Sequence, residues 1–264
     1  MKVGICGLGY VGKAYNKMFP DAVLYDKLKG IGTKNEINKT DMVVVAVPTN
    51  PMPDGSLDMS IIEEVVGWIE TPLILIKSAL MPGTVDYLKE KYNKRITVSV
   101  EMVGEGKYFI PYWKYPHPEN PLYHSFIIVG GDEKDATETA NYLWHKMSPE
   151  IDIHIVSAVE AEICKMMENT WGAMKVSFAN DIYEICQRYG ANYTKVLQAW
   201  GADGRVEKMH MRVIDGKRGW KSKCYDKDIP GLIRASELKG YEPKLIKAVV
   251  EANKEHLKQN DLDR

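Results

Sequence analysis

Short apolar runs recur through the first half of the chain, with polar segments or helical patterns between them. They lie at residues 2–6, 22–26, 42–47, 73–78, 97–101 and 125–131. Runs that are apolar at successive positions are typical of parallel strands, because helices cover both faces of such a sheet. The pattern predicts an α/β fold with a Rossmann-type, doubly wound parallel sheet.

The second half of the chain has the periodicity of helices instead of strands. Ser157 and Glu160 have the spacing of a capping box, and a helical pattern follows them without interruption to about Gly190. At 1.5 Å per residue this helix would be about 45 Å long. We therefore expect two domains, a Rossmann-like domain at residues 1–156 and an all-helical domain with one long central helix at residues 157–264.

Composition and charge exclude several classes of partner. The 35 basic and 36 acidic side chains leave a net charge of −1, so nothing attracts the whole chain to nucleic acid or to an anionic membrane. No apolar run approaches the roughly 20 residues of a membrane span, and the N-terminus lacks the layout of a signal peptide. The four cysteines show no CxxC spacing, which predicts reduced thiols and no metal site. We expect a cytoplasmic protein.

The stretch GLGYVG follows the first predicted strand and opens a helix expected from about Val11 to the residue before Pro20. Gly7 would allow the tight turn, Gly9 would let the backbone approach a pyrophosphate, and Gly12 would let the helix pack closely on the sheet. The phosphates would then lie at the N-terminus of the helix. The pattern favours dinucleotide binding over the alternative, a Gly-rich turn with a structural role only.

Three further strand ends add to the expected cofactor site. Asp26 ends the second strand, where an acid hydrogen-bonds a ribose diol and repels a 2′-phosphate, which favours NAD over NADP. Lys27 and Lys29 leave NADP open. Thr49 and Ser78 follow the third and fourth strands, at the edge where ligands of open α/β sheets bind, although such residues also shape turns. The expected cofactor contacts are Gly7, Gly9, Tyr10, Val11, Gly12, Asp26, Pro48, Thr49 and Ser78.

Two pairs of polar residues are further candidates. Glu101 ends the fifth strand and Glu105 follows four residues later, where carboxylates could accept a proton or orient a water; the alternative is a solvated acidic loop. Lys165 and Asn169 lie one turn apart on the predicted long helix and therefore share a face. Apolar neighbours would leave this lysine half-buried, as an oxyanion donor or proton shuttle requires, or it would simply snorkel to the surface.

The stretch KSKCYDKDIP places Cys224 in a polar loop, whereas a cysteine kept for packing normally lies in an apolar run. Asp228 is the expected N-cap and Pro230 the expected first-turn residue of a helix that continues to Leu238. A helix N-terminus and nearby lysines both favour the thiolate, so the thiol is a candidate nucleophile. The alternative is an incidental surface cysteine. Upstream, Arg205 lies in a Gly-rich connection, where an isolated arginine usually forms a surface ion pair.

The order of these motifs resembles that of one enzyme family. The sequence contains, in turn, GxGYVG, a strand-end acid, VPT, KSxxxPGT, ExxxEG, KxxxN, DxRV and CxxKD. From Met1 to about Asn253 it is similar to the UDP-glucose/GDP-mannose dehydrogenase family. The resemblance implies an NAD-dependent oxidoreductase of nucleotide-sugar metabolism and polysaccharide biosynthesis. Such an enzyme oxidises the primary alcohol of a nucleotide sugar such as UDP-glucose to a carboxylate with two NAD+.

The resemblance also assigns chemical roles, position by position. It implies that Cys224 adds to the intermediate aldehyde and that the resulting thiohemiacetal is oxidised to a thioester. Lys165 would stabilise the oxyanion, and Asn169 would hold substrate or water. Asp228 and Glu105 would handle protons and water during hydrolysis of the thioester.

Substrate contacts and a partner subunit follow from the same resemblance. Glu101 and Lys227 would contact a small-molecule substrate, either a nucleotide sugar or a sugar phosphate. Arg205 would reach the substrate of a neighbouring subunit in a homodimer built on the long helix. The first domain would then bind NAD, and the second would serve dimerisation and substrate binding.

The sequence departs from the family pattern at three places. Family members continue into a second Rossmann-like domain that holds the nucleotide, so this chain resembles a short form without it, in which the aromatic segment 107–124 or a partner would supply the lid. Ala79 stands where the family has a threonine, so a hydroxyl is missing unless Ser78 compensates. Before Cys224, a Gly-rich family stretch is replaced by bulkier residues that include Lys221 and Lys223, which would suit an anionic group.

Two other functions remain open on the sequence. The β-hydroxyacid dehydrogenases also join a Rossmann domain to a helical domain with a KxxxN helix, and they oxidise smaller alcohols, but they do not account for Cys224, Lys227 and Asp228 together. A noncatalytic NAD-binding dimer would account for Ala79 and for the absent domain.

Overall fold

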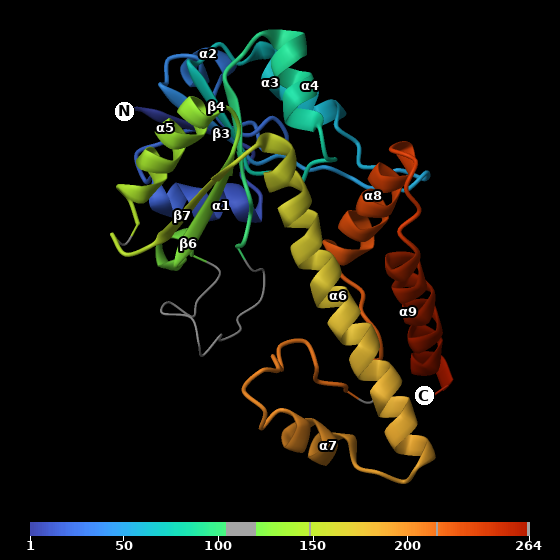
Figure 1. Cartoon of the computed structure of the whole chain (residues 1–264). Helices are drawn as coiled ribbons and strands as arrows, with labels where there is room; N and C mark the ends of the chain where they lie inside the picture. Colours follow the sequence, from blue (N-terminus) through green and yellow to red (C-terminus); the bar gives the residue numbers. More distant parts are fainter. Residues whose placement is uncertain (104–119, 148, 215, 263–264) are drawn as a thin grey trace. The chain divides into compact units, whose positions relative to one another are not determined.

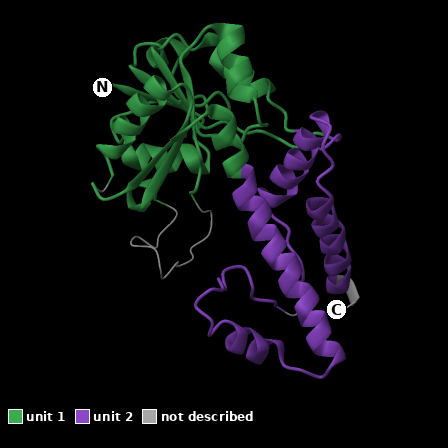
Figure 2. Cartoon of the chain, in the orientation of Figure 1, with its two compact units in different colours: residues 1–52, 57–165 green, residues 53–56, 166–264 purple. Residues whose placement is uncertain are grey.

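Two compact units make up the chain in this computed structural model. The structure describes residues 1–103, 120–147, 149–214 and 216–262. The first unit comprises residues 1–52 and 57–165, and the second comprises residues 53–56 and 166–264 (Figure 2). None of the helices in the described ranges is both long enough and apolar enough to cross a bilayer.

The first unit is built on a sheet whose strands follow the order β2-β1-β3-β4-β5-β6-β7. The strands are β1 (Val3–Cys6), β2 (Val23–Tyr25), β3 (Met42–Val45), β4 (Leu73–Ile76), β5 (Ile96–Ser99), β6 (Phe126–Gly130) and β7 (Asp152–Val156). Each of the six predicted strands is confirmed within two residues. The expectation of an all-parallel sheet is wrong at one place, because β5 and β6 pair antiparallel.

Helices cover both faces of this sheet (Figure 1). They are α1 (Tyr10–Met18), α2 (Lys34–Ile37), α3 (Ser60–Trp68), α4 (Thr84–Tyr92), α5 (Glu133–Trp144) and the short 3-10 helix η1 (Pro121–Tyr123). Alternate strand residues enter opposite apolar clusters: Val43 and Val45 join the cluster of α3 and α4, whereas Met42 and Val44 join that of α1 and α5. This alternation explains why the strands are apolar at every position.

The second unit is helical. The long helix α6 (Ala158–Arg188) has 31 residues and begins within the first unit. The Ser157 hydroxyl accepts a hydrogen bond from the Glu160 N–H at 3.4 Å, and the Glu160 carboxylate accepts one from the Ser157 N–H at 2.7 Å, so the predicted capping box is confirmed. The other helices are α7 (Tyr193–Trp200), α8 (Tyr225–Leu238) and α9 (Lys244–Leu262).

The predicted start of α8 is wrong. Cys224 is the N-cap, Asp228 lies in the first turn and Pro230 lies inside the helix. Ser222 explains the earlier start, because its hydroxyl accepts from the Tyr225 N–H at 3.0 Å and its carbonyl accepts from the Asp226 N–H at 3.0 Å. The thiol residue therefore occupies the helix N-terminus itself, not the loop before it.

Candidate active site

The glycine loop has the local geometry that its sequence predicts. Gly7 has φ +91°, and a Cβ there would lie 2.4 Å from the carbonyl oxygen of Ala46. A Cβ on Gly12 would lie 1.8 Å from the carbonyl oxygen of Gly7, so α1 packs directly on the loop. A Cβ on Gly9, the N-cap of α1, would meet nothing within 4 Å. The open space at Gly9 leaves the helix N-terminus accessible to a phosphate.

Asp26 lies just beyond β2 and faces the same loop. Its carboxylate accepts hydrogen bonds from the Leu8 N–H at 2.9 Å and the Lys29 N–H at 3.0 Å, and the Lys29 ammonium lies 3.5 Å away. Burial acts to raise the pKa of Asp26, but these hydrogen bonds and the Lys29 charge outweigh it and lower the pKa. An ionised acid therefore stands beside the glycine loop, as an acceptor for a ribose diol requires.

The segments after β3 and β4 are joined to each other. The Ser78 hydroxyl donates a hydrogen bond to the Val47 carbonyl at 2.7 Å, and Thr49 is buried. Since β3 and β4 are parallel, both segments leave the sheet at the same edge as the glycine loop. Pro48, Thr49 and Ser78 therefore lie at the edge where a dinucleotide binds in this type of sheet.

A buried lysine that was not predicted from the sequence contacts the residues at the end of β5. The Lys77 ammonium donates to the Ser99 hydroxyl and to the Val100 carbonyl, each at 3.0 Å, and forms a 3.3 Å ion pair with Glu101. It also lies 4.9 Å from the centre of the Tyr15 ring. The sequence did contain a signal for this cluster. A lysine directly follows the apolar run of β4, and an ammonium at a buried strand end needs an acid nearby.

Glu101, a predicted substrate contact, is held within this cluster. It is buried, and its second carboxylate oxygen accepts from the Val103 N–H at 2.5 Å. Burial lowers the pKa of Lys77, the Glu101 charge opposes this, and the positive charge of Lys165 lowers the pKa further. Lys165 therefore lies close enough to act electrostatically on Lys77, and it is half-buried on α6, as predicted.

Three of the other predicted residues come together within the second unit. The Asn169 side-chain amide donates to Asp228 at 2.5 Å, and the Lys227 ammonium contacts the other Asp228 oxygen. Asp228 is 1% exposed, and its N–H bonds to the Cys224 carbonyl at 2.8 Å. Cys224 itself is half-buried. A hydrogen bond thus links Asn169 and Asp228 across 59 residues of chain, and the backbone of Asp228 bonds to that of Cys224.

Arg205 and Glu105 stand apart from these groups. Arg205 has an exposed side chain that pairs with Asp203 at 2.5 Å, which is the ordinary surface ion pair that its sequence context indicates. Glu105, and most of the aromatic segment 107–124, lie outside the described residues. Within the described ranges, no group of three or more His, Cys, Asp or Glu side chains could hold a metal ion.

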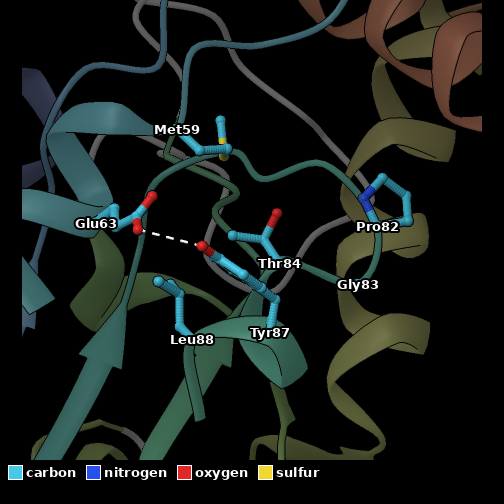
Figure 3. Close-up of a pocket in the computed structure, with 7 residues that line it drawn as sticks. All are labelled: Met59, Glu63, Pro82, Gly83, Thr84, Tyr87 and Leu88. Atoms are coloured by element: carbon cyan, nitrogen blue, oxygen red, sulfur yellow. Dashed lines mark hydrogen bonds between the residues drawn. The ribbon is translucent and has the colours of Figure 1, made fainter. Parts of the chain in front are cut away.

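A pocket of about 260 Å³ lies at the N-terminal ends of α3 and α4 (Figure 3). Its lining residues are Met59, Glu63, Pro82, Gly83, Thr84, Tyr87 and Leu88. The Tyr87 hydroxyl donates to Glu63 at 3.2 Å. Glu162 of α6 accepts from the N–H of the lining residue Gly83 at 2.5 Å and from the Val85 N–H at 2.9 Å. Three lining residues, Pro82, Gly83 and Thr84, belong to the KSxxxPGT motif, but none of the predicted site residues lines this pocket.

Comparison with known proteins agrees with the motifs. Residues 159–255 match the central domain of the UDP-glucose/GDP-mannose dehydrogenase family. The UDP-glucose 6-dehydrogenase AglM of Haloferax volcanii is 28% identical over 252 residues, which cover 86% of this chain and 55% of that protein. The chain thus spans about half the length of the curated relatives it matches.

The fold has solved counterparts in two kinds of dehydrogenase. A UDP-glucose dehydrogenase from Pyrobaculum islandicum superposes with a TM-score of 0.76 at 22% identity, over 96% of this chain and 68% of the other. A 3-hydroxyisobutyrate dehydrogenase from Mycobacterium tuberculosis superposes with a TM-score of 0.67 at 13% identity, over 95% and 91%. The structural likeness concerns the fold alone; by sequence, residues 159–255 are similar to the central domain of the UDP-glucose/GDP-mannose dehydrogenase family.

Proposed function

We propose that the protein is an NAD-dependent dehydrogenase that oxidises the primary alcohol of a nucleotide sugar, UDP-glucose or a close analogue, toward the uronic acid. The observation that carries this proposal is the hydrogen bond between Asn169 and Asp228, which joins the KxxxN and CxxKD motifs beside Cys224. In the β-hydroxyacid dehydrogenases the first motif occurs without the second. A linked pair of motifs therefore favours a thiol-dependent oxidation.

NAD would bind to the first unit, in the domain formed by residues 1–156. The helix N-terminus beyond Gly9 would hold the pyrophosphate, and the ionised Asp26 would accept hydrogen bonds from the adenosine ribose. A 2′-phosphate would meet the same negative charge, which favours NAD over NADP. Bound NAD+ would supply the hydride acceptor for each oxidation.

The residues of the chain would then divide the remaining chemistry. The Cys224 thiolate would add to the carbonyl carbon of the intermediate aldehyde, and the Lys165 ammonium would stabilise the negative oxygen that forms. Loss of a hydride from this adduct would leave a thioester on Cys224. Asp228 would accept a proton from the attacking water, and Asn169 would orient that water, so that hydrolysis releases the carboxylate and the thiol.

The long helix supports the proposed homodimer. Met167, Trp171, Phe178 and Ile185 are each more than half exposed, and their spacing puts them on one face of α6. An apolar stripe of this kind on a helix is typical of a subunit interface. We propose that a second copy of the chain covers it and that Arg205 reaches the partner's substrate. Sedimentation of Phe178→Glu at micromolar concentration tests this, since the variant should remain monomeric.

Two other functions each have an observation in their favour. The M. tuberculosis 3-hydroxyisobutyrate dehydrogenase matches this fold over nearly all of both chains. A smaller hydroxyacid would then be oxidised once, without a covalent intermediate. The noncatalytic NAD-binding dimer has Ala79 in its favour, because this residue lacks the hydroxyl of the family's threonine.

The deciding experiment follows NADH absorbance with NAD+ and a panel of nucleotide sugars, sugar phosphates and hydroxyacids. We expect NADH from a nucleotide sugar and, in Cys224→Ala, a loss of acid formation of about a thousandfold or more. Cys164→Ala is the matched control, since Cys164 is also half-buried, and it should remain active. Full activity of Cys224→Ala on a hydroxyacid would favour the second function, and NAD binding without any turnover would favour the noncatalytic dimer.

A further inference from the structure

The segment Arg218–Trp220, which ends four residues before Cys224, is held by side chains instead of by a neighbouring strand. The Asn253 side chain accepts from the Trp220 N–H at 2.7 Å and donates to the Trp220 carbonyl at 2.9 Å. Asn260 does the same at Arg218, at 2.5 Å and 3.0 Å. Each asparagine therefore satisfies both backbone groups of one residue, as a paired strand would.

The two asparagines lie on one face of α9, because they are seven residues apart. Gly219, between their two targets, has φ +71°, and a Cβ there would lie 2.6 Å from the Asn253 amide oxygen. The close approach of Asn253 therefore depends on a glycine at this position. We call Asn253 and Asn260 the amide clamp.

The long helix holds the opposite side of the same segment. The Arg218 side chain is 3% exposed; it donates to the Asn180 amide oxygen at 2.6 Å, pairs with Glu184 at 2.8 Å and lies 4.1 Å from the Tyr183 ring centre. The Trp220 indole N–H donates to the Ser177 hydroxyl at 3.0 Å. Side chains of α6 and α9 thus fix the segment from both sides.

The chain between this segment and the thiol has little freedom left. Trp220 packs edge-on against Tyr225, with ring centres 6.0 Å apart, and Ser222 caps the first turn of α8. The position of Cys224 is therefore determined by residues 218–220 on one side and by α8 on the other. A displacement of the clamped segment would move the N-cap residue of α8. It would thereby change how strongly the helix N-terminus stabilises the thiolate.

We propose that Asn253 and Asn260 are positioning residues for Cys224. The amide clamp holds the preceding segment so that the thiol has one orientation at the start of α8. The use of the thiol in catalysis rests on the proposed function. The placement of the thiol by the clamp does not. A misplacement of about 1 Å lowers the rate of an oriented reaction by up to about a hundredfold, so the clamp would act on kcat.

The test uses Asn253→Asp and Asn260→Asp in the full chain. Both replacements keep the side-chain shape and one acceptor but remove the donor to the Trp220 or Arg218 carbonyl. The rate of Cys224 alkylation by iodoacetamide is measured as a function of pH by mass spectrometry of the peptide, next to kcat and the KM for NAD+. We expect a change in alkylation rate of about threefold or more, a fall in kcat of about tenfold, and an unchanged KM.

Asn38→Asp is the matched control. Asn38 of the first unit also makes one backbone bond as donor and one as acceptor, to the Trp68 carbonyl at 3.1 Å and from the Glu70 N–H at 3.0 Å. It should lower the melting temperature by a similar amount and leave Cys224 alkylation unchanged. If Asn253→Asp does not fold, Asn260→Asp in the last turn of α9 decides.

Two results would separate the inference from its premises. If the clamp variants lose stability as the control does but keep the wild-type alkylation profile and kcat, the clamp is only structural and the inference is overturned. If the wild-type protein produces no NADH from any nucleotide sugar, the proposed function fails. A changed alkylation profile in the clamp variants would then still support the placement of the thiol by Asn253 and Asn260.

Discussion

The two parts of the candidate site are held in different ways. In the first unit, the glycine loop is fixed by backbone geometry, and the side chains of Asp26 and Ser78 bond to backbone groups within a few residues of a strand end. In the second unit, the residues around Cys224 are fixed by side chains from distant parts of the chain, such as the Asn169–Asp228 bond across 59 residues.

This difference determines how each part responds to substitution. A backbone turn that depends on a missing Cβ fails as a whole when a side chain is added, because the carbonyl it meets cannot move away. A network of side-chain hydrogen bonds loses one bond at a time, at about 1 kcal/mol each, and can keep its fold while its geometry relaxes. We call the first-unit residues of the site the cofactor part and the residues around Cys224 the thiol part. Substitutions in the cofactor part should therefore lower the stability of the fold, and substitutions in the thiol part should lower the reaction rate.

Gly12→Ala should have the largest effect on stability. The added Cβ would lie 1.8 Å from the Gly7 carbonyl oxygen, which belongs to the backbone of the same loop. We expect a loss of about 5 kcal/mol or more in the free energy of unfolding, because neither α1 nor the loop can move without leaving the sheet. Urea unfolding followed by circular dichroism measures it.

Gly9→Ala is the control that separates folding from cofactor binding. Gly9 has φ −69°, and its added Cβ would meet nothing within 4 Å, so stability should hardly change. Affinity for NAD+ should fall, since a methyl group would occupy the space that the pyrophosphate needs. Equal stability of Gly12→Ala and Gly9→Ala would contradict the proposal that backbone geometry holds the cofactor part.

The same difference explains what could be predicted from sequence. The glycine loop, Asp26 and the strands are local patterns, so composition and spacing within a few residues predict them. The start of α8 was misplaced because the polar residues 221–228 look like a loop, and only the Ser222 hydrogen bonds identify them as the cap and first turn of a helix. The amide clamp could not be predicted at all, because Asn253 and Asn260 are ordinary residues in a polar helix pattern.

The outermost strand β7 was not predicted, for a related reason. In β7, Ile153 and Ile155 alternate with Asp152 and His154, and the strand comes last in the sheet order, next to β6. An exposed edge strand buries few side chains, so it lacks the continuous apolar run by which the other strands were recognised. The antiparallel pairing of β5 and β6 likewise leaves no trace in their composition.

Lys77→Met tests an exception within the first unit, where a side-chain ion pair shapes the end of β5. Removing the ammonium would leave the buried Glu101 carboxylate without its counter-charge, 3.3 Å away in the wild type. We expect a loss of about 4 kcal/mol in the free energy of unfolding. The double variant Lys77→Met/Glu101→Gln should recover much of this loss, because no buried charge would remain unpaired.

Additive effects of the two substitutions would mean that the pair is not coupled, and backbone geometry alone would then hold the end of β5. The matched single variant is Glu101→Gln, which leaves Lys77 with its bonds to Ser99 and Val100. It should therefore be less destabilised than Lys77→Met. Activity should fall in both, since Glu101 is also a predicted substrate contact.

Of the three stability effects predicted, at Gly12, Lys77 and Glu162, that of Glu162 should be the smallest, and it depends on pH. Burial raises the pKa of this carboxyl from 4.5 to about 7, and the N–H groups of Val85 and Gly83 only partly offset the rise. The folded protein then binds a proton more tightly than the unfolded chain does, so stability falls as pH increases between about 4.5 and about 7. Above that range the loss reaches about 3 kcal/mol, at about 1.4 kcal/mol per pKa unit.

Urea unfolding at pH 5 and at pH 8 measures the effect, with a drop of about 2 to 3 kcal/mol expected in the wild type. Glu162→Gln cannot ionise, so its stability should change less between the same two pH values. The comparison with Glu160→Gln is direct, because Glu160 lies two residues away on α6, is solvent-exposed and has a lowered pKa. A wild type that gains stability over this range would mean that the hydrogen bonds to the α4 N-terminus outweigh burial and hold Glu162 ionised. In that case the charged Glu162 side chain would stabilise the first unit through its hydrogen bonds to the backbone. The two units would then differ less in how far side chains hold them.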